Sequence, residues 1–208
     1  DLQNLLTFGE IGYGEGKLQY PADIAVDSDG NFYIADFFNN YWSKFDKNGK
    51  WILNAGTEGT NNGQFNGPSG IAVDLQGNVY VSDQLNNRIQ VFDKNGNFKS
   101  ILQTEVSTPG GMCTDANGNL YVVDMRSCTI FKLDNSGKTL LKFGSAGTSD
   151  GQFVYPFDVS VDKSGNIFAI DRGLGKTAHA VIQKFDSTGK FVAKIGGNAS
   201  RVPQEDGK

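Results

Sequence analysis

Aspartate is the residue whose repeated placement in this sequence could support chemistry. Asp36, Asp83, Asp124 and Asp171 each end a short run of alternating apolar residues. Carboxylates gathered from such positions could hold a metal ion or act as an acid or base. An aspartate at one place in every unit is explained more simply as an acceptor for backbone amides in a turn or cap. We therefore expect a structural role for these four residues.

Two further aspartates, Asp23 and Asp158, stand two residues after a proline, where the other units have Gly70 and Gly111. In the arrangement inferred below, they begin innermost strands at the mouth of a central channel. Two carboxylates there could hold a calcium-type cation or orient a polar ligand, or they could line a solvated channel. We expect no cofactor, and the calcium-type cation is the alternative. The sequence assigns no metal ligands.

A loop at residues 172–179 is the one insertion in the pattern described below, and it contains the only histidine. Its Gly-Lys-Thr tripeptide resembles a phosphate-binding loop, but the first glycine at the required spacing and a following helix are missing. We therefore reject phosphate binding. Arg172, Lys176 and His179 are candidate partner contacts, because insertions on one face of a repeat array often carry function. A floppy surface loop is the alternative.

Adjacent aromatic residues mark a second candidate surface. Phe37 and Phe38 follow Asp36 in a loop, so strand alternation cannot turn both of them inward. An exposed aromatic ring can anchor an interface, although packing against a neighbouring unit is equally open. We add Asn39 and Arg126, which lie in loops of the same type, as candidate ligand or partner contacts.

Composition excludes several classes of function. The chain has 208 residues, 19 basic and 23 acidic, with a net charge of −4. This balance, without a run of Lys or Arg, argues against a nucleic-acid partner. Cys113, Cys128 and His179 are too few for a structural zinc site, and we expect two free buried thiols rather than a disulfide. No apolar run approaches the roughly 18 residues of a membrane span.

A repeat must position all of these residues. It is marked by five prolines, which are separated by 47, 41, 47 and 47 residues: Pro21, Pro68, Pro109, Pro156 and Pro203. Each unit holds four short runs rich in Val, Ile, Phe and Tyr, split by Gly, Asn and Asp. The Asp-x-x-Gly-Asn spacing predicts tight hairpins in which glycine takes a positive φ. The glycines concerned are Gly30, Gly77, Gly118 and Gly165.

A four-stranded antiparallel meander cannot bury both of its faces alone, but copies stacked around an axis can. The sequence therefore predicts an all-β fold, a β-propeller of four-stranded blades in a single domain spanning residues 1–208. The expected units are 21–67, 68–108, 109–155 and 156–202, with an outer strand and linker in 1–20. In this geometry, the loops between second and third strands share a face with the linkers between blades, as do Tyr20 and Tyr155.

The chain opens with a segment that matches an outermost strand. Residues 5–9 read Leu-Leu-Thr-Phe-Gly and align with residues 140–144, Leu-Leu-Lys-Phe-Gly. Four units with this orphan strand could be part of a longer propeller or could close as a small ring. They could also close with another chain, because an open propeller would expose strand edges and an apolar sheet face.

The second unit resembles the NHL repeat. The resemblance rests on Gly-Gln-Phe-Asn-Gly-Pro-Ser-Gly-Ile-Ala-Val-Asp at 63–74, Gly-Asn-Val-Tyr-Val-Ser-Asp at 77–83 and Asn-Asn-Arg-Ile-Gln-Val-Phe at 86–92. It extends from about residue 5 to 198, although Tyr41-Trp42 replaces Arg-Ile in the first unit. The resemblance implies a propeller, commonly of six blades. Many such proteins are extracellular or scaffold-type interaction domains, and some relatives are metal-dependent lyases or lactonases.

We therefore expect a non-catalytic binding module that presents loops to a protein, peptide or glycan partner. It could belong to a larger assembly outside the cell or in the cell envelope. The alternative is a metal-dependent lyase or lactonase-like enzyme with a channel site built on Asp23, Asp158 and His179. RNA binding, known among some NHL proteins, would need a basic face, and the arginines of this chain are scattered.

Overall fold

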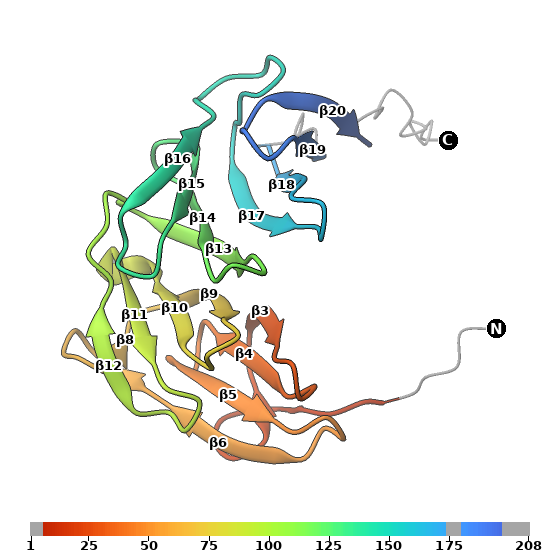
Figure 1. Cartoon of the computed structure of the whole chain (residues 1–208). Helices are drawn as coiled ribbons and strands as arrows, with labels where there is room; N and C mark the ends of the chain where they lie inside the picture. The colour runs from red at the N-terminus through yellow and green to blue at the C-terminus, as the bar shows by residue number, and fades with distance from the viewer. Residues whose placement is uncertain (1–5, 174–179, 197–208) are drawn as a thin grey trace, which may run out of the picture.

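A computed structural model describes residues 6–173 and 180–196 of the chain. Four antiparallel four-stranded sheets follow one another along the chain, and each is one blade (Figure 1). Blades 1 and 2 consist of β3 (Pro21–Val26), β4 (Phe32–Asp36), β5 (Tyr41–Phe45) and β6 (Trp51–Ala55), then β9 (Pro68–Val73), β10 (Val79–Asp83), β11 (Arg88–Phe92) and β12 (Phe98–Ile101). Blades 3 and 4 consist of β13 (Pro109–Thr114), β14 (Leu120–Asp124), β15 (Thr129–Leu133) and β16 (Thr139–Phe143), then β17 (Pro156–Val161), β18 (Ile167–Asp171), β19 (Val181–Phe185) and β20 (Phe191–Ile195).

The four blades are arranged around an axis as in a propeller, and their first strands lie innermost. Strand β9 packs against β3 and β13, and β13 packs against β17. The blades form an arc that is open between blades 1 and 4 (Figure 1). The predicted β-propeller of four-stranded blades is confirmed. No helix in the described ranges is long and apolar enough to cross a membrane.

The hydrophobic core lies between successive blades, because neighbouring sheets pack face to face. Trp42 of blade 1 and Phe92 of blade 2 share one fully buried cluster. Ile89 and Phe131 belong to the cluster between blades 2 and 3, and the third cluster lies between blades 3 and 4. This arrangement makes each blade depend on its nearest neighbours, as in other repeat proteins.

Blade 4, at one end of the arc, leaves one apolar face uncovered by described residues, whereas blade 1, at the other end, exposes mainly Ile24 and Val26 of its inner strand, each 54% exposed. In blade 4, Ile170 is 39% exposed and Ile182 is 38% exposed, whereas Val123 and Ile130 at the matching positions of blade 3 are 0% exposed. An apolar groove of about 280 Å³ runs over this face of blade 4. Association that completes the propeller stays a prediction.

The hairpin turns are nearly identical in every blade, as predicted. In blade 2, Gly77 donates its amide to the Asp74 carbonyl and Asp74 donates its amide to the Asn78 carbonyl, both at 3.0 Å. The Asp74 carboxylate also accepts the amides of Gln76 and Asn78. The four glycines predicted to take a positive φ do so: Gly30 at 84°, Gly77 at 80°, Gly118 at 80° and Gly165 at 82°.

The opening segment packs as the alignment predicted but does not form the expected strand, since residues 6–9 are irregular. The Phe8 ring lies 4.8 Å from Phe32 and 4.9 Å from Phe45, measured between centroids. A Cβ on Gly49 would stand 2.8 Å from Phe8, just as one on Gly189 would stand 2.8 Å from Phe143. Phe8 thus packs on blade 1 at the position that corresponds to that of Phe143, which belongs to blade 3 and packs on blade 4.

The segments that lead into blades 1, 2 and 4 contain short parallel pairings that the sequence did not suggest. Strand β1 (Glu10–Ile11) pairs with β2 (Lys17–Leu18), and β7 (Thr57–Glu58) pairs with β8 (Gln64–Phe65). Ala146 and Phe153 form the equivalent bridge before blade 4.

Both cysteines are free, as expected, and burial raises the pKa of the Cys113 thiol to about 12.

Candidate partner-binding face

One face of the arc gathers the loops that join the second and third strands of each blade. We call it the loop face and define it by loops 37–40, 84–87, 125–128 and 172–173 with linkers 19–20, 66–67, 107–108 and 154–155. The Phe37 amide donates to the Tyr20 carbonyl at 3.0 Å. The Met125 and Arg172 amides make the equivalent bonds in blades 3 and 4, and in blade 2 the Leu85 amide donates to the Asn66 carbonyl of the linker. The expectation that loops and linkers share one face is confirmed.

The four repeated aspartates hold these loops to the linkers. Asp36 accepts the amides of Gln19 at 2.6 Å and Tyr20 at 3.0 Å. Asp83 accepts the amide of Asn66 at 2.7 Å. The same bonds recur in blades 3 and 4, and all four carboxylates are buried. The expected structural role of these residues is therefore confirmed.

Hydrogen bonds keep one of these carboxylates ionised. Burial alone would raise the pKa of Asp124, but hydrogen bonds from Ser107 and Ser127 outweigh it and lower the pKa. An ionised carboxylate only accepts hydrogen bonds, so it suits a site surrounded by donors.

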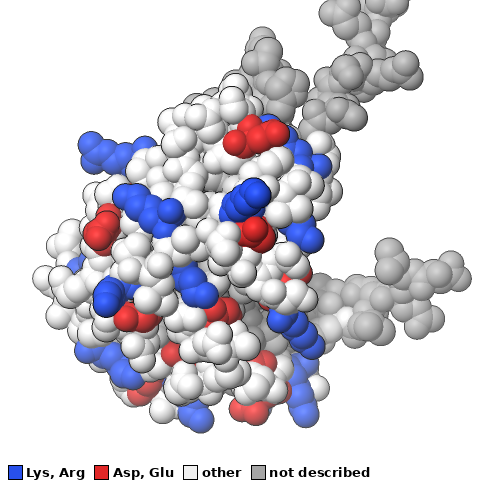
Figure 2. Space-filling model, turned by 45° about the horizontal axis from the view of Figure 1, so that its top comes forward, with Lys and Arg blue, Asp and Glu red and all other residues white. Residues whose placement is uncertain are grey.

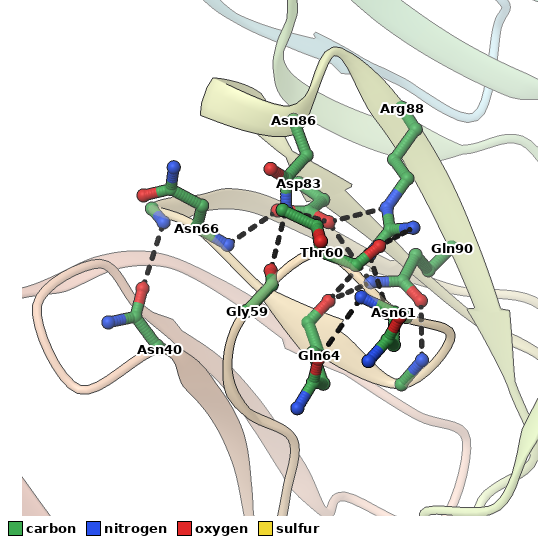
Figure 3. A network of polar contacts seen from close by, with 12 residues as sticks. Asn40, Gly59, Thr60, Asn61, Gln64, Asn66, Asp83, Asn86, Arg88 and Gln90 are labelled. Atoms are coloured by element: carbon green, nitrogen blue, oxygen red, sulfur yellow. Dashed lines mark hydrogen bonds and ion pairs between the residues drawn. The ribbon is translucent and has the colours of Figure 1, made fainter.

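Blade 2 surrounds its aspartate with a polar network (Figure 3). The η1 turn (Gln84–Asn86) brings Asn86 to Asp83, and Arg88 Nε lies 2.7 Å from Asp83 Oδ2. The two Nη atoms of Arg88 donate to three carbonyls of the preceding linker, and Gln90 Nε2 donates to Asp83 at 3.1 Å. Arg88 is therefore a structural residue whose donors point inward.

Blade 1 presents aromatic rings at the same place. The Tyr20 ring lies 6.0 Å from Phe37 and 5.0 Å from Phe38, and the two phenylalanine rings are 5.5 Å apart. Phe38 is 57% exposed and Tyr20 is 47% exposed. We call these three residues the aromatic cluster. The expectation that at least one of Phe37 and Phe38 is exposed is confirmed.

The apolar surface continues from the aromatic cluster onto blade 2. A Cβ on Gly67 would lie 2.8 Å from the Phe37 ring and 3.1 Å from the Leu85 side chain, so both side chains cover this glycine. Leu85 is 54% exposed. Asn40 Oδ1 accepts the Gly67 amide at 2.9 Å and fixes the loop of blade 1 to the linker of blade 2 (Figure 3).

On blades 3 and 4 the loop face becomes cationic. Gln84 Nε2 lies 3.3 Å from Met125 Sδ, which links blade 2 to blade 3. On blade 4, the guanidinium carbon of Arg172 lies 3.1 Å above the centre of the Phe157 ring. Arg126 is exposed beside Met125. The view in Figure 2 shows basic and acidic side chains interspersed over the molecular surface.

Asp23 and Asp158 occupy the inner ends of blades 1 and 4. Asp23 accepts the amides of Ile24 at 2.7 Å and Ile71 at 2.8 Å. A Cβ on Gly111 would lie 2.2 Å from Asp158 Oδ1, so glycine there makes room for the carboxylate. Burial, with a contribution from the charge of Asp158, raises the pKa of Asp23 to about 7.

These two carboxylates are therefore close enough to interact, and both are half-buried at the inner ends of their blades. Burial also raises the pKa of Asp158, against the opposing effects of the Val159 amide and Arg172. Among the described residues, no three His, Cys, Asp or Glu side chains are placed to share a metal ion. The calcium-type cation stays an untested alternative.

Not every candidate contact reaches the loop face. Asn39 is buried, and its Nδ2 atom donates to Asp36, Tyr41 and the Gly12 carbonyl, so it belongs to the internal support of the loop. Lys176 and His179 lie outside the described residues. Phe157 was missed, although a large ring directly after a proline, where the other units have small residues, was a visible signal.

Comparison with known proteins identifies the repeat. The family model of the NHL repeat matches residues 18–42 and 65–92. Protein lin-41 of Caenorhabditis elegans is 46% identical over 48 residues, which make up 23% of this chain and 4% of that protein.

Solved structures similar to this chain share its fold at low sequence identity. Hydrazine synthase of Kuenenia stuttgartiensis superposes with a TM-score of 0.65 at 16% identity, over 88% of this chain and 51% of that one. Virginiamycin B lyase of Staphylococcus aureus, in a catalytically inactive form with quinupristin, gives 0.65 at 16% identity, over 90% and 60%. A protein of unknown function from Bacteroides thetaiotaomicron gives 0.63 at 20% identity, over 88% and 48%. The chain thus spans about half the length of these structures.

Proposed function

We propose that this chain, an NHL-repeat β-propeller, is a non-catalytic binding module that presents its loop face to a protein or peptide partner. The observation that carries this proposal is the aromatic cluster, with Phe38 57% exposed and Tyr20 47% exposed on a face built of loops. Aromatic rings held on a rigid scaffold supply large contact area at a small cost in conformational entropy. NHL repeats are commonly protein-interaction modules, which agrees with this use.

The supporting structure of the loop face also favours binding over catalysis. The repeated aspartates, which could have served as acids, bases or metal ligands, are occupied by backbone amides of the linkers. The rings of the aromatic cluster, by contrast, face solvent, and no polar group of the linkers depends on them. A rigid frame with free apolar side chains is suited to recognition.

Selection from a random peptide library displayed on phage, with the chain immobilised, tests this function. Enriched peptides should bind the wild-type chain in solution, and Phe38→Ser should weaken that binding at least about tenfold by removing an aromatic anchor. Leu75→Ser is the matched control, because Leu75 is an exposed apolar residue in the turn between β9 and β10, away from the loop face. Equal losses in both variants, or binding only to an array of glycans, would contradict the proposal.

A metal-dependent lyase or lactonase-like enzyme is the second candidate, and the interacting pair of Asp23 and Asp158 favours it. One solved neighbour is named as a lyase, and its likeness to this chain extends to the fold. Calcium-dependent turnover of a lactone panel, abolished in Asp158→Asn, would support this candidate over the binding module. Catalytically silent protein without a calcium-induced rise in melting temperature would remove it.

The compartment and any larger assembly follow from the family resemblance alone. We propose an extracellular or cell-envelope location for the protein, as one domain of an assembly in which the uncovered face of blade 4 and the exposed inner strand of blade 1 meet further surfaces. Fractionation of cells that express the natural protein tests the location directly. Recovery in the cytoplasm would contradict it.

A further inference from the structure

We infer that the loop face binds an acidic peptide segment in a single direction, with an apolar residue on blades 1 and 2 and a carboxylate at Arg126 and Arg172 on blades 3 and 4. This inference rests on the proposed function and names its partner class. It is drawn from a difference between the two halves of the loop face, because one half offers aromatic and aliphatic side chains and the other offers guanidinium groups.

The apolar half is a continuous surface over two blades. Phe38 and Tyr20 stand exposed with their ring centres 5.0 Å apart, and Phe37 packs against both of them. Phe37 and Leu85 then cover Gly67, where any side chain would collide with them. The surface therefore has a firm floor, and an apolar side chain of the partner would be buried between Phe38 and Leu85.

The two halves are connected by contacts that cross each blade boundary. Gln84 of blade 2 touches Met125 of blade 3 at 3.3 Å. Met125 and the Phe157 carbonyl would both lie within 3.1 Å of a Cβ on Gly110. Phe157 in turn carries the guanidinium of Arg172. A peptide can thus follow one unbroken course from the aromatic cluster to Arg172.

The cationic half offers donors that the fold leaves unused. Arg172 stacks on Phe157 and makes no ion pair with any described residue, and the same holds for the side chain of Arg126. Arg88 shows the contrast, since its Nε is bonded to Asp83 and both of its Nη atoms are bonded to carbonyls of the preceding linker. A guanidinium stacked on a ring keeps its edge free to bind a carboxylate with two parallel hydrogen bonds.

Carboxylates of the loop face do not neutralise these arginines at the surface. Asp124 and Asp171 are buried and accept backbone amides, so they cannot turn outward to pair with Arg126 or Arg172. The charge of Arg172 also acts on Asp158, but that carboxylate lies against Gly111 of blade 3 rather than over the loop face. Charge complementarity therefore favours an acidic partner at this end.

Paired selections from the same displayed library test the inference. Peptides enriched on the wild-type chain should contain an aromatic or aliphatic residue followed or preceded by Asp or Glu in one consistent order. Selection on the Arg126→Gln, Arg172→Gln double variant should keep the apolar residue and lose the acidic preference. The matched control is Lys99→Gln, which removes an exposed cation from outside the loop face and should change neither preference.

Binding of one enriched peptide, labelled with fluorescein, then gives the size of the effect. The double variant should bind it about tenfold more weakly than the wild-type chain at low salt. A peptide with Asn and Gln in place of its Asp and Glu should lose the same affinity for the wild-type chain, and it should lose no further affinity for the double variant. Peptides that need Phe38 but show no acidic preference would overturn this inference and leave the proposed function standing. No enrichment of peptides would overturn both. Tighter binding of a single-stranded RNA, lost in the double variant, would also overturn the inference.

Discussion

Blades 2 and 4 each hold the loop between their second and third strands with an aspartate at the same repeat position. The side chains that surround this aspartate differ between the two blades. In blade 2, Asp83 is surrounded by Asn86, Arg88 and Gln90, whose side chains also donate to carbonyls of the preceding linker. In blade 4, Asp171 accepts the linker amides and the Gly173 amide, and Val181 stands where blade 2 has Arg88. In the loop that matches the repeat best, the polar side chains around the aspartate are thus engaged within the fold, and Leu85 stays exposed.

Departures from the repeat are therefore the better guide to recognition. Blade 1 replaces Gln84 and Leu85 with Phe37 and Phe38, and blade 3 places Arg126 where blade 2 has Leu85. These substitutions leave the aspartate and its linker bonds intact. The fold is maintained by what the blades share, and the loop face is made specific by what they do not share.

The largest expected effect distinguishes the two aspartates directly. Asp83→Ala would leave Arg88 Nε without its acceptor and the guanidinium without its counter-charge, and we expect it to lower the free energy of unfolding by about 4 kcal/mol. Asp171→Ala would remove only acceptors for backbone amides, and we expect a loss of about 2 kcal/mol. Urea denaturation of both variants measures the difference. Equal losses would mean that the network in blade 2 adds nothing to stability.

A second test compares blades 1 and 4 with blades 2 and 3 at the inner strands, where aspartate replaces glycine. The pKa of Asp23 is raised from 3.8 to about 7, so the folded chain holds this proton more tightly than the unfolded chain. The stability contributed by Asp23 is then complete below about pH 4 and is lost as pH rises to about 7. Relative to wild type, Asp23→Asn should therefore become more stable with rising pH, by roughly 4 kcal/mol over this interval.

The partner carboxylate provides the control for that pH dependence. Asp158→Asn removes a charge that disfavours ionisation of Asp23, so the pKa of Asp23 should fall. The pH range over which Asp23 changes the stability should then end below pH 7. Arg172 and Cys113, the other titratable groups that interact with Asp158, are unchanged in this variant. A difference between wild type and Asp23→Asn that stays constant from pH 4 to pH 8 would contradict the raised pKa.

A third test concerns the hairpin turn between the first and second strands, which is alike in all four blades. Gly77→Val should lower the free energy of unfolding by about 1 to 3 kcal/mol, because valine tolerates a φ of 80° poorly. Only the flexible Lys94 side chain lies near this glycine, so strain rather than collision is the cause. Gly118→Val should cost a similar amount, since its φ is also 80°. Thermal melting that is unchanged in either variant would show that the turn does not need glycine.

The smallest expected effect restores the repeat in blade 3. Cys128 has a φ of 53°, a conformation that asparagine adopts more easily, as Asn40 does at 54° and Asn87 at 55°. Cys128→Asn should raise the free energy of unfolding by about 0.5 kcal/mol, measured by urea denaturation. A loss in its place would show that burial of the thiol outweighs the backbone preference.

Much of this fold could be predicted from the sequence because turn chemistry is local. The aspartate and glycine of each hairpin determine the turn, and the prolines that begin each blade determine the period. The parallel pairing of β7 with β8 could not be predicted, since two residues on each side carry no pattern of their own. The strand expected at residues 5–8 is absent from the described residues 6–8, because there is no sheet for them to join.

The candidate site was less accessible to prediction, because exposure depends on neighbours from other blades. Adjacent Phe37 and Phe38 signalled a surface, but nothing in the sequence indicated that Leu85 meets Phe37 over Gly67. Asn39 seemed a contact residue by its position, yet its amide is used within the loop. A polar side chain next to a buried aspartate is more often part of its support.

The bonds from each repeated aspartate have a consequence for how such a chain can change in evolution. Asp83 is tied to the linker that enters its own blade, and so are its three counterparts. A gene duplication or recombination event that copies a linker together with the blade that follows it in sequence keeps each aspartate with the amides it binds. An event whose junction falls at the first proline of a blade separates the aspartate from those amides. Copy number in such proteins should therefore vary by units whose junctions fall just after the outermost strand.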